Sequence, residues 1–186
     1  MQFVAAQGIR DATVLEIGGG VGEIQLELLR LGAGRVTNLE ITSNYEAEAE
    51  RLIAQAGAGG RITRRQLDIA RSSDQVEAAD VVILHRVVCC YPDYQRLLSA
   101  AGSHARRMLV FSHPGDNLPA KAAIWFENVL RRVRGNSFRA YAHSAAAMVA
   151  AAEAQGLAAE YKQRSGAWHV VGLVRRSQEE VESTER

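Results

Sequence analysis

Strand-like and helix-like segments alternate along the chain, and this alternation restricts the fold more than any other feature. Short apolar runs predict five strands at residues 12–16, 35–41, 62–67, 80–84 and 107–111. Helical periodicity of apolar residues predicts helices between several of them, at residues 21–31, at 43–56 and from Pro92. This order is typical of a parallel sheet with helices on both faces.

The segment after the fifth strand is longer than a simple crossover requires. It predicts an added helix at residues 119–134, a second helix at 144–155 and a closing pair of strands near 158–163 and 168–174. We therefore expect an α/β fold, a Rossmann-like, seven-stranded and mostly parallel sheet with an added lid helix. We expect residues 1–175 to form one domain with a lid insertion at about 114–143, and residues 176–186 to form a charged, disordered tail.

Composition excludes several classes of protein. With 186 residues and 47% hydrophobic content, the chain suits one compact domain. No apolar run approaches the roughly 20 residues that span a bilayer, and no signal peptide is recognisable. A net charge of +1 argues against a nucleic-acid binder. Adjacent Cys89 and Cys90 fit neither a cross-fold disulfide nor a zinc site. We expect a bacterial, cytoplasmic protein without a metal.

The glycine-rich segment V-L-E-I-G-G-G-V-G, residues 14–22, joins the first strand to the first predicted helix. Glycines allow a sharp bend and the close approach of a ligand. A dinucleotide-binding fingerprint would need a further glycine where Glu23 or Gln25 stands. The segment therefore predicts a nucleotide-type site, but disfavours a nicotinamide-dependent dehydrogenase.

Two acids stand at the ends of the first two strands. Glu16 directly precedes the glycines, where its charge would repel a pyrophosphate and favour a methionine ammonium and sulfonium. Glu40 closes the second strand, 18 residues after Gly22. An acid in that position can accept both hydroxyl groups of a ribose.

The pattern E-x-G-x-G-x-G, with acids after the second and third strands, resembles class I S-adenosylmethionine (SAM) methyltransferases. The resemblance covers nearly the whole chain. It implies that the glycine loop wraps the amino-acid part of SAM, that Glu40 binds the ribose and that Asp68 contacts the adenine amino group. Simple capping of helices or turns stays an alternative for Glu16 and Asp68. The implied cofactor residues are Glu16, Gly18, Gly19, Gly20, Glu40, Ile41, Asp68, Ile69 and His85.

The acceptor is expected beyond the carboxyl ends of the fourth and fifth strands, where open α/β sheets bind ligands. These strands deliver the segments H-R-V-V-C-C-Y-P and S-H-P. We name Tyr91, His113 and His143 as catalytic candidates, the histidines because they titrate near neutral pH. Ordinary packing and satisfied hydrogen bonding are the alternative roles. The substrate-contact candidates are Arg86, Tyr91, Trp125 and Tyr141.

Within the family, the chain looks most similar to magnesium-protoporphyrin carboxyl methyltransferases and their bacterial relatives. The likeness rests on the glycine loop, the Y-P turn after the fourth strand and the later F-R-x-Y-x-H segment. It implies transfer of a methyl group from SAM to a small-molecule acceptor, with oxygen favoured. N-methylation and SAM binding without catalysis stay open, as does a homodimer.

Overall fold

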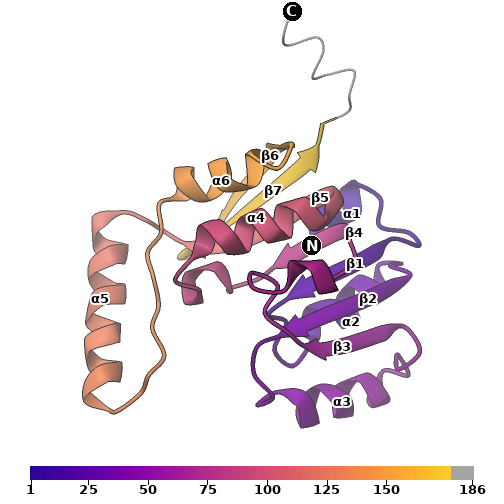
Figure 1. The fold of residues 1–186 in the computed structure, drawn as a ribbon, viewed down its shortest axis with the longest axis horizontal. Helices are drawn as coiled ribbons and strands as arrows, with labels where there is room; N and C mark the ends of the chain where they lie inside the picture. Colours follow the sequence, from indigo (N-terminus) through magenta and orange to yellow (C-terminus); the bar gives the residue numbers. More distant parts are fainter. Residues whose placement is uncertain (177–186) are drawn as a thin grey trace, which may run out of the picture.

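The computed structural model describes residues 1–176 and contains one mixed seven-stranded sheet (Figure 1). The strand order is β3-β2-β1-β4-β5-β7-β6. The first five strands pair in parallel, whereas β7 is antiparallel to both β5 and β6. The predicted architecture is confirmed. The strands are β1 (Thr13–Ile17), β2 (Arg35–Glu40), β3 (Ile62–Gln66), β4 (Ala79–Leu84), β5 (Ala105–Pro114), β6 (Leu157–Ser165) and β7 (Trp168–Arg175). The predicted tail falls, from residue 177 on, outside the described residues.

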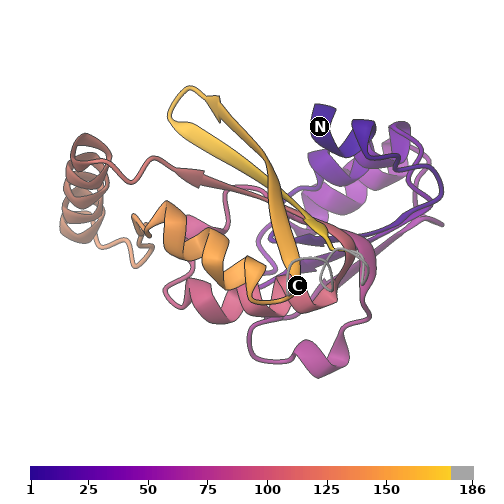
Figure 2. The same ribbon diagram turned by 90° about the horizontal axis from the view of Figure 1, so that it is seen from above.

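Helices cover both faces of the sheet (Figure 2). One face carries α1 (Gln2–Ala6), which the sequence did not predict, α2 (Glu23–Arg30) and α3 (Glu46–Gln55). The other face carries α4 (Tyr94–His104) and α6 (Ala145–Glu153). Two short 3-10 turns, η1 (Ser73–Gln75) and η2 (Val88–Cys90), flank β4. No helix among residues 1–176 has both the length and the apolar character needed to cross a bilayer.

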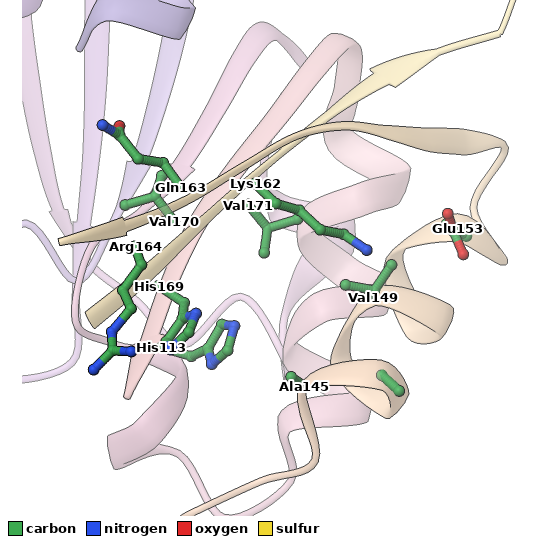
Figure 3. A pocket seen from close by; sticks show the side chains of 11 residues that line it. His113, Ala145, Val149, Glu153, Lys162, Gln163, Arg164, His169, Val170 and Val171 are labelled. Atoms are coloured by element: carbon green, nitrogen blue, oxygen red, sulfur yellow. The ribbon is translucent and has the colours of Figure 1, made fainter. Parts of the chain in front are cut away.

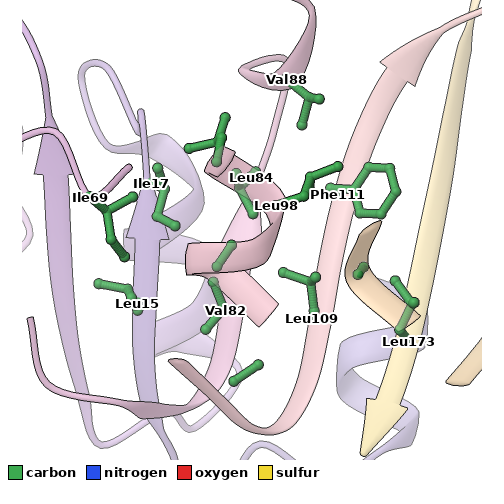
Figure 4. Close-up of a cluster of buried hydrophobic side chains, with 14 of the residues drawn as sticks. Leu15, Ile17, Ile69, Val82, Leu84, Val88, Leu98, Leu109, Phe111 and Leu173 are labelled. Atoms are coloured by element: carbon green, nitrogen blue, oxygen red, sulfur yellow. The ribbon is translucent and has the colours of Figure 1, made fainter. Parts of the chain in front are cut away.

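A separate apolar core fills the space on each face. Under α4 and α6, Leu98, Leu109 and Phe111 are fully buried among aliphatic side chains from the sheet (Figure 4). Burial of such a side chain stabilises the fold by roughly 1.5–3 kcal/mol. These layers hold the carboxyl ends of β1, β2 and β4 rigidly beside one another.

Ser43 and Glu46 have the Ser-x-x-Glu spacing that predicts a capping box for the helix at 43–56, but the structure forms none. The helix α3 begins only at Glu46, its N-cap is Tyr45, and no side chain caps it. Instead, Glu46 accepts a bond from Arg64 Nε of β3 at 3.1 Å, while its backbone N–H bonds the carbonyl of Ser43. The ion pair between Glu46 and Arg64 of β3 thus replaces a capping bond within the helix. Within α3, only Ala49 is fully buried.

The added helix α5 (Leu118–Val133) stands apart from the body of the molecule (Figures 1 and 2). None of its residues is buried, and Trp125 is 67% exposed. The helix is tied to the returning chain through Asn128, whose side chain bonds both backbone groups of Ala140. The helix forms where it was expected, but here its apolar side faces solvent.

Candidate active site

The glycine loop leaves β1 in a conformation that side chains disfavour. Gly18, Gly20 and Gly22 have φ values of +68°, +54° and +91°. A Cβ on Gly19 would lie 2.0 Å from the Asn38 amide nitrogen. The N–H of Gly18 bonds the carbonyl of Leu39, which ties the loop to β2. The loop therefore presents bare backbone at the carboxyl edge of the sheet.

A cavity of about 430 Å³, here called the edge cavity, opens where β1, β2 and β4 end. Glu40 lies at its wall, and its carboxylate accepts bonds from Gly20 N at 3.1 Å and Ile41 N at 2.8 Å. A Cβ on Gly20 would meet nothing within 4 Å, so the loop borders open space. The edge cavity unites these predicted cofactor residues: Gly18, Gly20, Glu40, Ile41, Asp68 and Ile69.

The remaining predicted cofactor residues surround a smaller cavity of about 120 Å³. Glu16, Gly19 and His85 line it, and Gly18 lines both cavities. The two cavities therefore lie on either side of Gly18, the first glycine of the loop. An elongated ligand could place one end in each of them.

A buried polar row that the sequence analysis missed runs beneath the loop. Register places Glu16 beside Asn38, and Asn38 beside Arg64, across β1, β2 and β3. Glu16 is 1% exposed and accepts a bond from Asn38 Nδ2 at 2.9 Å. Burial raises the pKa of Glu16 to about 7, although Asn38 and Arg64 act in the opposite direction. The sequence did contain a signal for this row, because Asn38 and Arg64 are polar residues inside segments predicted to be parallel strands.

Asp68 and Tyr91 are joined across the edge cavity. The Tyr91 hydroxyl donates to Asp68 Oδ2 at 2.9 Å, and the N–H of Ala70 donates to Oδ1 at 3.0 Å. Partial burial and this carboxylate raise the pKa of Tyr91. A phenol that is held protonated and already donates is a poor general base.

The end of β4 holds a strained cationic residue. Arg86 has φ +59°, and its N–H donates to Ser112 Oγ at 2.9 Å. The same hydroxyl contacts His85 Nδ1 at 3.1 Å. Partial burial and the neighbouring charge of Arg86 lower the pKa of His85. The Arg86 guanidinium lies 4.9 Å from the centroid of the Trp168 ring of β7.

His143 fastens the chain after α5 to the turn that follows β4. Its Nε2 donates to the carbonyl of Tyr91 at 3.0 Å, and its ring packs against those of Tyr94 and Tyr141. The Tyr141 N–H bonds the carbonyl of Cys89 at 2.6 Å. Partial burial lowers the pKa of His143. Two predicted residues, Tyr141 and His143, thus hold the turn at Cys89–Tyr91 from the same side-chain cluster.

His113 lies elsewhere, in a cavity of about 610 Å³ between α6 and the β6–β7 hairpin (Figure 3). Its ring stacks on that of His169 at 5.3 Å, and Nδ1 contacts the carbonyl of Pro114 at 2.8 Å. Partial burial lowers the pKa of His113. Its lining residues do not line the edge cavity, so the structure does not bring His113 to the other predicted residues. Trp125 lines neither cavity.

The sequence profile of a methyltransferase domain family matches residues 14–109, which span the glycine loop, Glu40, Asp68 and the end of β4. The chain belongs to the SAM-dependent methyltransferase family. SAM is accordingly its cofactor, and methyl transfer is its class of reaction. No curated protein matches the chain in sequence.

Solved structures confirm the SAM-dependent methyltransferase fold. Magnesium protoporphyrin IX methyltransferase from Synechocystis PCC 6803 with bound S-adenosylhomocysteine (SAH) is 23% identical, with a TM-score of 0.74 over 94% of this chain and 78% of that one. An O-methyltransferase family protein from Burkholderia thailandensis is 19% identical, with a TM-score of 0.76 over 95% and 55%. Mitomycin 7-O-methyltransferase is 24% identical, with a TM-score of 0.67 over 93% and 52%.

A Gly18→Ala substitution tests whether the loop must stay bare in this methyltransferase. Its Cβ would lie 2.5 Å from Val87 Cγ2, at the seam of the two cavities. We expect SAM affinity to fall at least tenfold in calorimetry. Gly57→Ala is the matched control, since Gly57 has φ +61° with nothing within 4 Å of its Cβ. Equal SAM affinity in both variants would contradict the role of the loop.

Proposed function

We propose that this protein transfers the methyl group of SAM to an oxygen atom of a small-molecule acceptor at the carboxyl edge of β4. The edge cavity carries this proposal, because its acids and bare backbone match the parts of SAM. Relatives named for O-methylation and for magnesium protoporphyrin methylation support the choice of acceptor class. Residues 1–175 form the catalytic domain, and residues 114–143 its insertion.

The residues fit SAM part by part. Glu40 presents its carboxylate at the cavity wall, where a ribose would lie with its two hydroxyl groups toward the acid. Ile69, 1% exposed, and Ile41, 62% exposed, border the space for the adenine ring. Asp68 would accept from the adenine amino group beside its bond to Tyr91. The methionine end would then occupy the small cavity beside the glycine loop, Glu16 and His85.

Bound SAM supplies an activated methyl group on a positively charged sulfur. The protein has to align the acceptor with that carbon and exclude water, because the cofactor provides the difficult chemistry. Arg86 and Tyr91 border the place where an acceptor would approach, and Tyr141 is bonded to the neighbouring turn at Cys89. Trp125 would take part only if α5 closed over the edge. His85 stands beside the methionine end.

The three catalytic candidates differ in what they can do. Tyr91 serves best as a hydrogen-bond donor that orients Asp68. His143 serves best as a positioning residue for the Tyr91 turn. Burial lowers the pKa of His113, and this histidine could act as a base only on an acceptor that reached the separate cavity beside α6. An acceptor that is already anionic would need none of these bases.

Equilibrium dialysis tests the proposal directly. We expect the protein to bind radiolabelled SAM and SAH with micromolar or tighter affinity, and to leave reduced nicotinamide cofactors unbound. Release of SAH in the presence of an acceptor separates a methyltransferase from a binding protein, and alkaline hydrolysis of the product separates esters from ethers and amines. Failure of well-folded protein to bind either SAM or SAH would refute the proposed function.

A further inference from the structure

Arg86 adopts a backbone conformation that needs a compensating interaction. A φ of +59° is rare for a residue with a side chain and costs of order 1–3 kcal/mol. The strain is held by Ser112, whose hydroxyl on the neighbouring strand accepts the Arg86 N–H at 2.9 Å. Such outliers cluster at ligand sites, where surrounding contacts force one side chain into a chosen direction.

The direction forced on Arg86 is toward Trp168. The guanidinium carbon lies 4.9 Å from the ring centroid, within the range of a cation–π contact. Trp168 stands at the start of β7, opposite Pro114 at the end of β5. A residue 82 positions away in sequence thus holds the side chain in place at the edge of the sheet. Arg86 is exposed, and its contact with Trp168 gives the side chain a preferred position at the surface.

The charge of Arg86 is not neutralised by the protein. Among residues 1–176, its guanidinium forms no ion pair and no hydrogen bond, although five other arginines pair with acids. A stacked guanidinium retains its planar N–H edge for a ligand, and that edge matches the two oxygens of a carboxylate. Arg86 also lines the edge cavity, on the side of the β4 turn.

We propose that Arg86, positioned by Trp168, binds a carboxylate of the methyl acceptor, so that the enzyme selects anionic acceptors. This inference rests on the proposed function. When the carboxylate itself is methylated, an oxygen lone pair forms the new O–CH3 bond and the electron pair of the S–CH3 bond stays on sulfur. A carboxylate and a sulfonium become a neutral ester and a neutral thioether. No proton leaves, so this step needs no general base.

Matched probes test this inference without knowledge of the natural acceptor. 1-Naphthoate and 1-naphthamide have nearly the same shape and differ in charge. We expect SAH-saturated protein to bind 1-naphthoate at least tenfold more tightly than 1-naphthamide at low salt, measured by ligand-observed NMR titration. Arg86→Gln should abolish that preference, and Trp168→Leu should reduce it by loosening the guanidinium. Arg86→Lys should restore part of it, since the charge remains but the planar edge is lost.

Arg30→Gln is the control, because Arg30 is exposed and already paired with Glu27. It should leave the naphthoate preference unchanged, and thermal unfolding should show that every variant is folded. Equal binding of the two probes, no binding of either probe, or an unchanged preference in Arg86→Gln would each overturn the inference. If the parent protein does not bind SAH, the proposed function itself fails, so the two failures are distinguishable.

Discussion

Replacing Glu40 by alanine is expected to lower the affinity for SAM about 100-fold. The loss corresponds to about 2.7 kcal/mol, the range for removing hydrogen bonds to a charged group. The substitution also leaves Gly20 N and Ile41 N without the carboxylate that now accepts from both of them. Calorimetric titration with SAM and with SAH should show the same factor, because the ribose is common to both ligands.

The comparison of the two ligands decides how Glu40 acts. A loss confined to SAM would mean that the acid attracts the sulfonium charge and does not bind the ribose. Glu48→Ala is the control, since Glu48 is an exposed acid paired with Arg51 on α3. Should Glu40→Ala bind SAH as tightly as the parent, the edge cavity would not be the nucleoside site.

Replacing Glu16 by glutamine is expected to stabilise the protein, and to do so more at high pH than at low pH. Burial raises the pKa of Glu16 from 4.5 in the unfolded chain to about 7 in the fold. The folded state therefore holds a proton that the unfolded state has lost, and stability falls as pH rises from 4.5 to 7. Above pH 7 the cost of burying the charge is constant.

The expected size follows from this difference. At about 1.4 kcal/mol per pKa unit, the free energy of unfolding should gain about 2 to 3 kcal/mol more from Glu16→Gln at pH 8 than at pH 5. Urea unfolding at both pH values measures it, and the exposed Glu50→Gln of α3 is the control. A benefit independent of pH would show that Glu16 is not a buried acid that loses its proton near neutrality. The same variant should bind SAM more weakly, because a negative charge beside the methionine end is removed.

The helix α5 shows that local sequence signals predict a helix but not where it packs. Asn117 caps the helix and Pro119 stands in its first turn, so the helix itself was predictable from the sequence. Its placement depends on contacts with distant parts of the chain, and among residues 1–176 these are few. Trp125 was therefore a reasonable candidate that the structure leaves at the surface.

The sequence alone determined the alternation of strands and helices, the bare loop after β1 and the two acids at neighbouring strand ends. These features are local, and the rule that parallel strands end at one edge brings Glu16, Glu40 and the loop together. Only the tertiary structure decided three contacts. Asn38 donates a hydrogen bond to Glu16, Arg64 pairs with Glu46 in place of a helix cap, and the Arg86 guanidinium lies over the Trp168 ring. Each of these contacts joins different elements, and strand register sets their partners, which short-range periodicity does not encode.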